Sequence, residues 1–272
     1  MRRLLTFSLG KEEIGASLDE AGSSVGLLLV MGGSQSRIGS HRMYERLAHA
    51  LSQKGISCFR YDRRGVGDSS GIDQGFRDSA EDLVAAADRF RIESPSLERL
   101  YGFGLCDGAS ALALFAGRAR LDGVILVNPW LVEATSGEPP PAAIRRHYRQ
   151  RILSADAWRR LLAGAIDFRK LLNGLKKVAA NQSSALARDV AAALRAHRRP
   201  ARFILASGDA TAIAAQNEIR TPDYKGLAGD IATIESDSHT FARPGDEQSL
   251  AEAVWNSVQA FEAARAQSSA GP

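Results

Sequence analysis

Short apolar runs recur along most of the chain, separated by glycine-rich turns or by amphipathic stretches. The runs lie at residues 25–31, 56–61, 99–103, 123–127, 201–206 and, more weakly, 231–234. Runs that are apolar at nearly every position are typical of strands buried on both faces, as in a parallel sheet. The opening segments 4–9 and 13–18 predict two further strands, joined as a hairpin through Gly10 and Lys11.

Amphipathic stretches between these runs predict helices. Residues 41–54 have a helical pattern of apolar positions, with Ser40 as the expected N-cap and Gly55 as the stop. Further helices are expected at residues 78–92, 109–115 and 247–264. Strands that alternate with helices in this way predict an α/β fold with a mostly parallel, doubly wound sheet.

One region interrupts the alternation. Residues 131–199 contain no convincing strand and are rich in arginine, lysine and alanine, so we interpret them as a helical cap insertion. The insertion follows the strand 123–127 and would cover the carboxyl ends of the strands, where such folds bind ligands. We therefore expect a core of residues 1–130, a cap of 131–199, a second core part of 200–265 and a disordered tail of 266–272.

The composition is that of an ordinary globular protein, with 44% apolar and 24% charged residues in a chain of 272. A chain of this length can bury a sizeable core and needs no disulfide or metal for stability. We find no secretory signal after Met1, and no apolar stretch approaches the length of a transmembrane helix. We therefore expect a cytoplasmic protein whose two cysteines stay reduced.

Positive charge is concentrated in the insertion, although the formal net charge is only +4. The basic residues of the stretch 145–177 are Arg145, Arg146, Arg149, Arg151, Arg159, Arg160, Arg169, Lys170, Lys176 and Lys177. They alternate with apolar residues in a basic amphipathic helical pattern. Three hypotheses stay open: a solvated face of the cap, a docking surface for an acidic carrier protein or anionic carrier-linked sugar, or adsorption to an anionic membrane. We do not expect nucleic-acid binding, because no recognition motif accompanies the charge.

Cys106 lies at the centre of a G-x-C-x-G pentapeptide, from Gly104 to Gly108. A strand-like run precedes it and a helix-like run follows it. This is the context of a nucleophile elbow, in which G-x-S-x-G holds a serine on a sharp turn. The N-terminus of the following helix favours a thiolate, the reactive form of cysteine. An inert, buried cysteine is the alternative, and Cys58, within the run 56–61, fits that description.

A cysteine nucleophile needs a base, and the base needs an acid that orients it. Among the five histidines, His239 follows the last weak strand, and Asp209 directly follows the strand 201–206. The chain order Cys106, Asp209, His239 is the nucleophile–acid–histidine order of α/β hydrolases. The alternatives are that Asp209 only caps a helix and that His239 is a surface residue. Asp237 is a rival acid, but it is so near His239 in sequence that its approach to the imidazole is awkward.

An acyl-transfer site also needs N–H donors for the oxyanion that develops in the transition state. The elbow supplies the backbone N–H of Asp107. The second donor is expected from the loop after the strand 25–31, at Gly33 or Ser34. The alternative is that this glycine-rich loop is simply a tight turn.

Several segments together resemble one known family. They are the D-x-R-G-x-G-x-S turn at 62–69 and the segments 32–42, 104–110, 128–130 and 237–241. On these residues the chain is similar to the type 1 exosortase A system-associated hydrolases, found beside bacterial exopolysaccharide and PEP-CTERM sorting genes. The resemblance implies an α/β-hydrolase fold with a triad of Cys106, Asp209 and His239. It implies little about the substrate, because the family is named for its gene neighbourhood.

These observations predict an acyl hydrolase, an esterase or thioesterase, that works through an acyl-cysteine intermediate. His239 would take the Cys106 proton or pair with the thiolate, and Asp209 would hold the imidazole. Two alternatives stay open. One is an acyltransferase that passes the acyl group to a sugar or amine in exopolysaccharide-related metabolism, and the other is a non-catalytic binding scaffold. We expect no metal and no organic cofactor.

Overall fold

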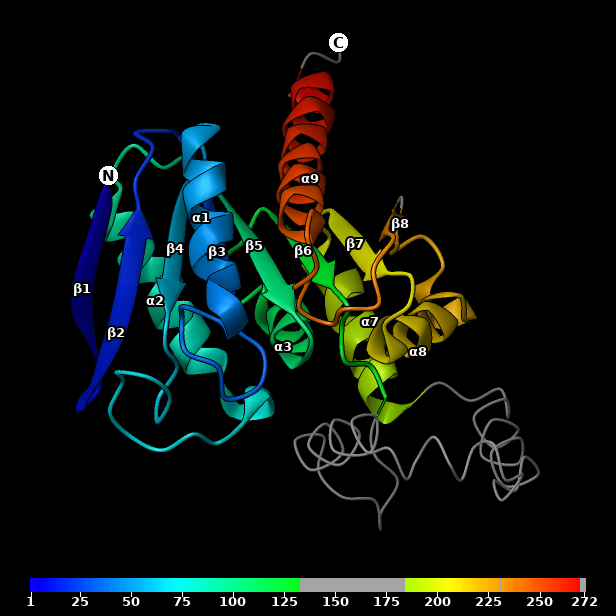
Figure 1. The fold of residues 1–272 in the computed structure, drawn as a ribbon, viewed down its shortest axis with the longest axis horizontal. Helices are drawn as coiled ribbons and strands as arrows, with labels where there is room; N and C mark the ends of the chain where they lie inside the picture. The colour runs from blue at the N-terminus through cyan, green and yellow to red at the C-terminus, as the bar shows by residue number, and fades with distance from the viewer. Residues whose placement is uncertain (133–183, 230, 270–272) are drawn as a thin grey trace.

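The computed structural model describes residues 1–132, 184–229 and 231–269. Within these residues the strands form one sheet of eight, in the order β1-β2-β4-β3-β5-β6-β7-β8 (Figure 1). The strands are β1 (Arg2–Leu9), β2 (Glu12–Asp19), β3 (Val25–Val30), β4 (Ser57–Tyr61), β5 (Arg99–Leu105), β6 (Gly123–Val127), β7 (Ala201–Ala206) and β8 (Ile231–Ile234). β2 pairs antiparallel with β1 and β4, and all other neighbours pair in parallel. The prediction of a mostly parallel sheet is confirmed.

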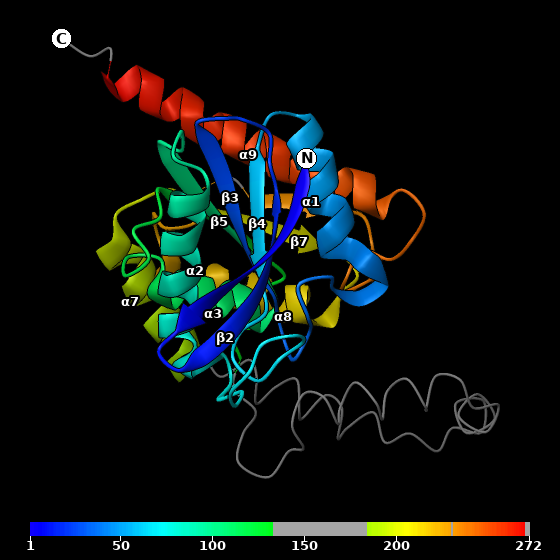
Figure 2. The ribbon, with the colours of Figure 1, turned by 90° about the vertical axis from the view of Figure 1, so that its left-hand side faces the viewer.

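Helices cover both faces of this sheet (Figures 1 and 2). They are α1 (Met43–Gln53), α2 (Ala80–Glu93), α3 (Asp107–Phe115), α7 (Ala185–His197), α8 (Ala210–Ile219) and α9 (Asp246–Ser269), with short 3-10 turns at Ser40–Arg42, Phe76–Asp78 and Pro222–Tyr224. α1 and α9 share one apolar cluster with one face of the sheet. α2, α3, α7 and α8 share a second cluster with the other face. The sheet is therefore doubly wound.

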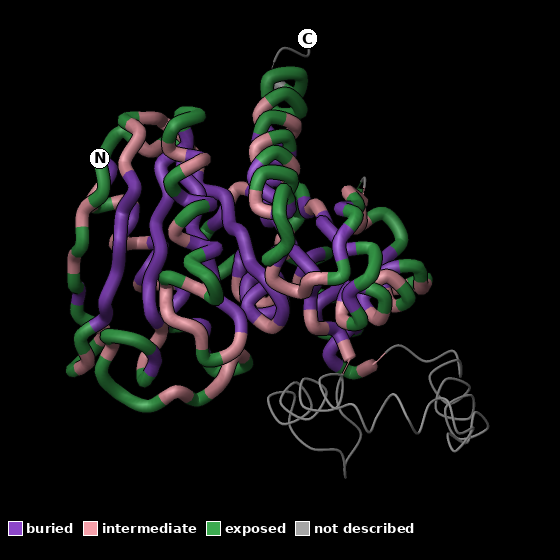
Figure 3. The backbone as a smooth tube through the Cα atoms, in the orientation of Figure 1, coloured by how far each residue is buried: buried purple, intermediate pink, exposed green. Residues whose placement is uncertain are grey.

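The central strand β3 shows why its sequence is apolar at almost every position. Leu27 and Leu29 pack into the cluster of α1 and α9, whereas Leu28 and Val30 pack into the cluster of α2 and α3. Successive side chains of a strand point to opposite faces, so both faces of a covered sheet need apolar residues. The buried strands at the centre and the exposed outer faces of the helices are visible in Figure 3.

The start of α1 differs from the prediction. Ser40 was expected as its N-cap, but the helix begins at Met43, with Arg42 at the cap position in the left-handed region (φ 64°). Ser40 begins a 3-10 turn instead, and its backbone N–H donates to the Gln35 side chain. Gly39 lies against the Tyr44 ring, where a Cβ would be 2.3 Å from a ring carbon. This packing turns the chain before α1 can begin.

The expected cap, residues 131–199, lies partly outside the described residues. The basic residues between Arg145 and Lys177 are among those not described, so the three hypotheses for them remain predictions. The described end of this region is α7, whose N-cap is Ser184. α7 packs in the same apolar cluster as α3, so this helix is part of the core. The Ser184 hydroxyl donates to the carbonyl of Leu131, so the chain leaves and rejoins the core at one place.

The closing helix is longer than expected. α9 runs to Ser269, so residues 266–269 are helical rather than part of a disordered tail. Residues 270–272 lie outside the described part of the chain. Among the described helices, none combines the length and the apolar character that a membrane crossing requires.

Candidate active site

Cys106 lies on the sharp turn between β5 and α3. Its backbone is strained for a non-glycine residue, with φ 61° and ψ −129°. The turn is held on both sides, because Cys106 N–H donates to the carbonyl of Val127 (3.0 Å) and its carbonyl accepts from Trp130 N–H (3.1 Å). The flanking glycines are required for space: a Cβ on Gly104 would be 2.7 Å from Ala109 Cα, and one on Gly108 would be as close to the β3 backbone. The strand–turn–helix expected around Cys106 is thus present.

His239 and Asp209 meet at the same edge of the sheet. Asp209 directly follows β7 and is 8% exposed, and its Oδ2 lies 3.0 Å from His239 Nδ1. The same oxygen accepts the backbone N–H of Ala212 at 2.9 Å, which makes Asp209 the N-cap of α8. The capping role and the contact with the imidazole, treated as alternatives from the sequence, therefore coexist in one carboxylate.

His239 is positioned to carry a positive charge. Burial disfavours the charged imidazole, but hydrogen bonds with Asp209 and Cys106, together with their charges, outweigh burial and raise its pKa to about 9. Because Nδ1 bonds Asp209, the other ring nitrogen is the one that serves Cys106. An imidazolium between a carboxylate and a thiol can stabilise a thiolate and can later donate its proton.

The rival acid does not reach the imidazole. Asp237 pairs with Arg243, and its side chain is 58% exposed. The structure therefore brings Asp209, and not Asp237, to His239.

The loop after β3 lies over the elbow. Gly33 N–H donates to Oδ1 of Asp107, and Gly32 N–H reaches the hydroxyl of the buried Tyr44 (3.4 Å). The Ser34 hydroxyl donates to Asp73 (3.3 Å). In the part of the chain that the structure describes, the backbone N–H groups of Asp107 and Ser34 have no hydrogen-bond partner. Of the three expected oxyanion donors, two are thus free and one is engaged by a neighbouring carboxylate.

Comparison with known proteins agrees with this architecture. The family model for serine aminopeptidases of the S33 type matches residues 26–221. The chain belongs to this family of α/β hydrolases. No curated protein sequence matches the chain. The family is named for serine enzymes, whereas the elbow of this hydrolase carries Cys106.

Many solved structures share the fold. An esterase of Pyrococcus furiosus, Pf2001, is 15% identical, covering 93% of this chain and 91% of that one, with a TM-score of 0.63. Est1E of Butyrivibrio proteoclasticus, solved with ferulic acid, is 15% identical over 95% of this chain and 99% of that one, with a TM-score of 0.63. A thioesterase domain of the curacin biosynthetic pathway is 14% identical over 94% and 99%, with a TM-score of 0.60. At these identities the likeness shows the fold alone, and it confirms the predicted α/β-hydrolase architecture.

Asn128 of this hydrolase is a site residue to which the sequence analysis gave no role. It directly follows β6, is fully buried, and has a positive φ of 40°. Its Nδ2 donates to the carbonyl of His239 (3.1 Å), and its Oδ1 accepts the N–H of Ala206 (2.8 Å). Asn128 therefore ties the histidine loop to the ends of β6 and β7. An asparagine directly after a buried strand was the available signal, since asparagine tolerates positive φ.

Asp62 connects the glycine-rich turn to the loop over the elbow. It is fully buried and accepts the backbone N–H of Arg37 and of Asp68, and it also pairs with the Arg37 guanidinium. Gly67 lies against this carboxylate at φ 57°, where a Cβ would be 2.3 Å from Asp62 Oδ2. The turn motif of residues 62–69 is therefore folded around one buried carboxylate, which also binds Arg37 in the loop after β3.

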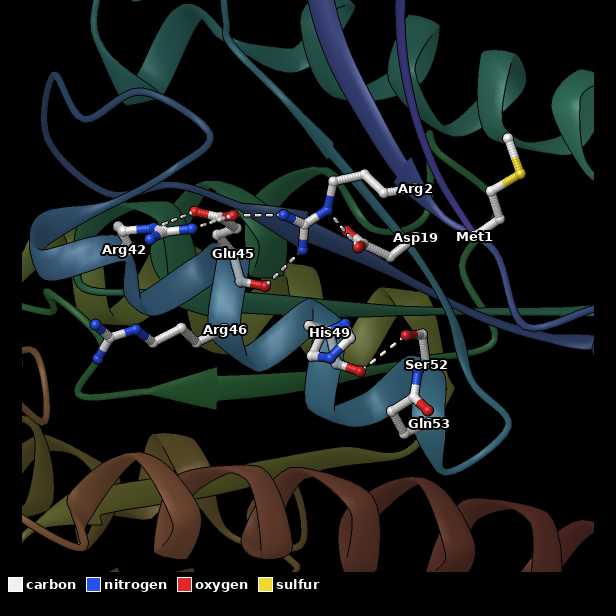
Figure 4. Close-up of a pocket in the computed structure, with 9 residues that line it drawn as sticks. All are labelled: Met1, Arg2, Asp19, Arg42, Glu45, Arg46, His49, Ser52 and Gln53. Atoms are coloured by element: carbon white, nitrogen blue, oxygen red, sulfur yellow. Dashed lines mark hydrogen bonds and ion pairs between the residues drawn. The ribbon is translucent and has the colours of Figure 1, made fainter.

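A cavity lies apart from the candidate catalytic residues. The cavity, of about 450 Å³, lies beside α1 and the first two strands, and Figure 4 shows its lining. Its charged groups are largely paired with one another: Arg2 bonds Asp19 (2.6 Å) and Glu45, and Arg42 bonds Glu45 (2.7 Å). Hydrogen bonding to Arg42 and Arg2 lowers the pKa of Glu45 to about 2. None of the candidate catalytic residues lines this cavity. Among the described residues, no cluster has the composition of a metal site.

Proposed function

We propose that this chain is a cysteine-dependent acyl hydrolase that cleaves esters or thioesters through an acyl-Cys106 intermediate. The observation that carries the proposal is the arrangement of Cys106 on the strained elbow, with His239 between Cys106 and Asp209. Membership of the hydrolase family supports hydrolysis as the class of reaction. The likeness in fold to an esterase and a thioesterase domain is compatible with the proposed substrates.

The first half of the reaction forms the acyl-enzyme. The Cys106 thiolate adds to the carbonyl carbon of the substrate, and the carbonyl electrons move to oxygen, where backbone N–H groups stabilise them. The tetrahedral intermediate collapses as the bond to the leaving alcohol or thiol breaks. His239, protonated at neutral pH, gives its proton to that leaving group.

The second half regenerates the enzyme. The neutral imidazole of His239 takes a proton from water, and the oxygen of that water adds to the acyl carbon. The bond to Cys106 breaks, the acid leaves, and the thiolate and imidazolium are restored. Asp209 fixes the orientation of the imidazole throughout and stabilises its charged form. An acyltransferase would differ only in this half, where a sugar or amine would take the place of water.

We keep the resemblance to the exosortase-associated hydrolases as part of the proposal, and exopolysaccharide-related metabolism as the setting of the acyltransferase alternative. The cysteine at the elbow agrees with the resemblance.

Intact mass spectrometry tests the proposal. The protein is incubated with a panel of acyl thioesters and esters, and the mass added to the chain is measured with and without sugar or amine acceptors. We expect one acyl group on wild type and on Cys58→Ala, and none on Cys106→Ala. An acyl adduct that persists in Cys106→Ala and disappears in Cys58→Ala would falsify the assignment of the nucleophile. Acyl groups found on the acceptor, rather than free acid, would identify a transferase.

A further inference from the structure

The side chain of Asp107 lies against the loop that is expected to supply the second oxyanion donor. Its Oδ1 accepts the backbone N–H of Gly33 at an N–O distance of 2.5 Å. Asp107 is also the first residue of α3, and its own backbone N–H is the first expected donor. Asp107 therefore carries one expected donor, its own N–H, and occupies another, the Gly33 N–H, with its carboxylate. The N–H of Ser34, the third expected donor, is left free by the described residues.

The same carboxylate lies beside the nucleophile. A Cβ placed on Gly32 would be 2.8 Å from Asp107 Oδ1 and 3.1 Å from Cys106 Cβ, so both side chains border this glycine. Tyr44 holds the loop from the buried side through Gly32 N–H, and Asp107 holds it from the elbow side through Gly33 N–H. The N–H of Gly33 is thus directed at the elbow and is already bonded to an anionic oxygen.

We propose that the Asp107 side chain determines substrate specificity, because it occupies the Gly33 N–H in the free protein and must release it in the acylation step. This inference rests on the proposed acyl-transfer function. When the Cys106 thiolate adds to a carbonyl carbon, the new oxyanion needs the N–H groups around the elbow. The oxyanion and the carboxylate are both negative and compete for one donor.

The released carboxylate needs a new partner, and this requirement selects the substrate class. An acyl group with a positive charge next to the reacting carbonyl supplies that partner at the moment when Gly33 is given up. A neutral acyl group leaves the carboxylate unpaired, and an anionic one is repelled, because close like charges are unfavourable in a partly buried site. The site therefore favours acyl donors that are cationic beside the carbonyl.

A matched pair of probes isolates the charge. The phenyl thioesters of trimethylglycine and of 3,3-dimethylbutanoic acid have nearly the same shape, but the first has a quaternary nitrogen where the second has carbon. Acylation of Cys106 by each is measured in wild type, Asp107→Asn and Asp107→Ala. Each rate is divided by the rate of alkylation by iodoacetamide, a reaction that forms no oxyanion and so reports thiolate reactivity alone.

We expect Asp107→Ala to react faster with the neutral thioester, and Asp107→Asn to gain less, because its neutral amide oxygen can still accept the Gly33 N–H. A single oxyanion donor is worth about 10²–10³ in rate, and freeing one that is only partly blocked should give about tenfold. The cationic thioester should gain nothing or should slow, because it loses its partner. The preference for the cationic donor, relative to the neutral one, should therefore fall by about tenfold or more.

Asp73→Asn is the control. Asp73 accepts the Ser34 hydroxyl and pairs with Arg63, so it supports the same loop without bonding Gly33. This variant should change both thioesters by the same factor. If the Asp107 variants also changed the rates of both thioesters by the same factor, their preference for the cationic donor would be unchanged. Asp107 would then only support the loop, and this inference would be overturned while the proposed function would stand. If iodoacetamide alkylated the proteins but neither thioester acylated any of them, both the proposed function and this inference would be overturned.

Discussion

The two cysteines of this chain are both buried but lie in different surroundings. Cys58 and Cys106 are both free thiols, exposed by 0% and 5%. Cys58 lies within β4, its Sγ is 3.5 Å from the carbonyl of Ile56, and burial raises the pKa of its thiol far above the ordinary value. The charge of Arg60 favours a thiolate there, but burial and the charge of Asp19 outweigh it, so we expect this cysteine to behave as a small apolar residue.

Cys106 differs because its strand has ended. The turn after β5 places it at the N-terminus of α3 and within reach of an imidazole whose pKa is raised to about 9. Reactive cysteines are commonly found in such surroundings. The comparison predicts that position at the carboxyl edge of the sheet, rather than exposure, decides which of the two thiols reacts.

Substituting each cysteine in turn should give the largest difference in kcat/KM. Cys106→Ala should lower kcat/KM for a thioester by at least about 10⁴-fold, as removal of a covalent nucleophile does, while Cys58→Ala should change it by no more than about threefold. Cys106→Ser should fold and retain only a small part of the activity, since a hydroxyl needs more help from its base than a thiol does. Steady-state hydrolysis of one thioester by the purified variants measures all three. Equal losses in the two alanine variants would show that the comparison of sites is wrong.

Substitutions of His239 and Asp209 should have the next largest effects on the rate of acylation. His239→Ala should slow acylation by about 10³–10⁴-fold, because both the proton donor and the partner of the thiolate are lost. Asp209→Asn should cost about 10²-fold or more through the histidine, and asparagine still caps α8, so the helix is preserved. Single-turnover acylation is the measurement, with Asp237→Asn as the control that should stay within about twofold. A neutral Asp209→Asn beside a severe Asp237→Asn would reassign the acid.

Much of the fold follows from the sequence because its signals are local. The run at 25–31 is apolar on both faces since β3 is covered on both, and Gly104 and Gly108 are required by close backbone contacts in the turn. The start of α1 was not predictable in the same way. Ser40 has the right side chain for an N-cap, but the packing of Gly39 against the Tyr44 ring decides the path of the chain.

The site shows the same division between local and distant signals. The order of Cys106, Asp209 and His239 could be read from the sequence, since each follows a recognisable strand. The hydrogen bonds of Asn128 and of the Asp107 carboxylate depend on which distant segments meet at the sheet edge. No spacing rule encodes those contacts, so the position of Asn128 after a buried strand could mark the residue but not its hydrogen-bond partners.

Asn128→Ala should lower activity less, because Asn128 acts only by positioning the loop that carries His239. It removes two buried hydrogen bonds and places alanine at positive φ, so we expect a loss of about 1–3 kcal/mol in the free energy of unfolding. The His239 loop would be held less firmly, and kcat should fall by about tenfold while KM changes little. Chemical denaturation and steady-state kinetics measure the two effects, and Asn217→Ala, on the exposed side of α8, is the control. A change in KM alone would show that Asn128 does not position the histidine.

The smallest effect should be the dependence of stability on pH. The folded-state pKa of His239 is raised from 6.5 to about 9, so its contribution is fully present below pH 6.5 and is lost as the pH rises through 9. Denaturant titrations between these values should show a loss on the order of 2 kcal/mol. Cys106→Ala should reduce that loss, because Cys106 supplies part of the interaction, whereas Cys58→Ala should leave it intact. If the free energy of unfolding depended on pH equally in both variants, Asp209 alone would stabilise the charged imidazole. The pairing of Cys106 with His239 would then be wrong.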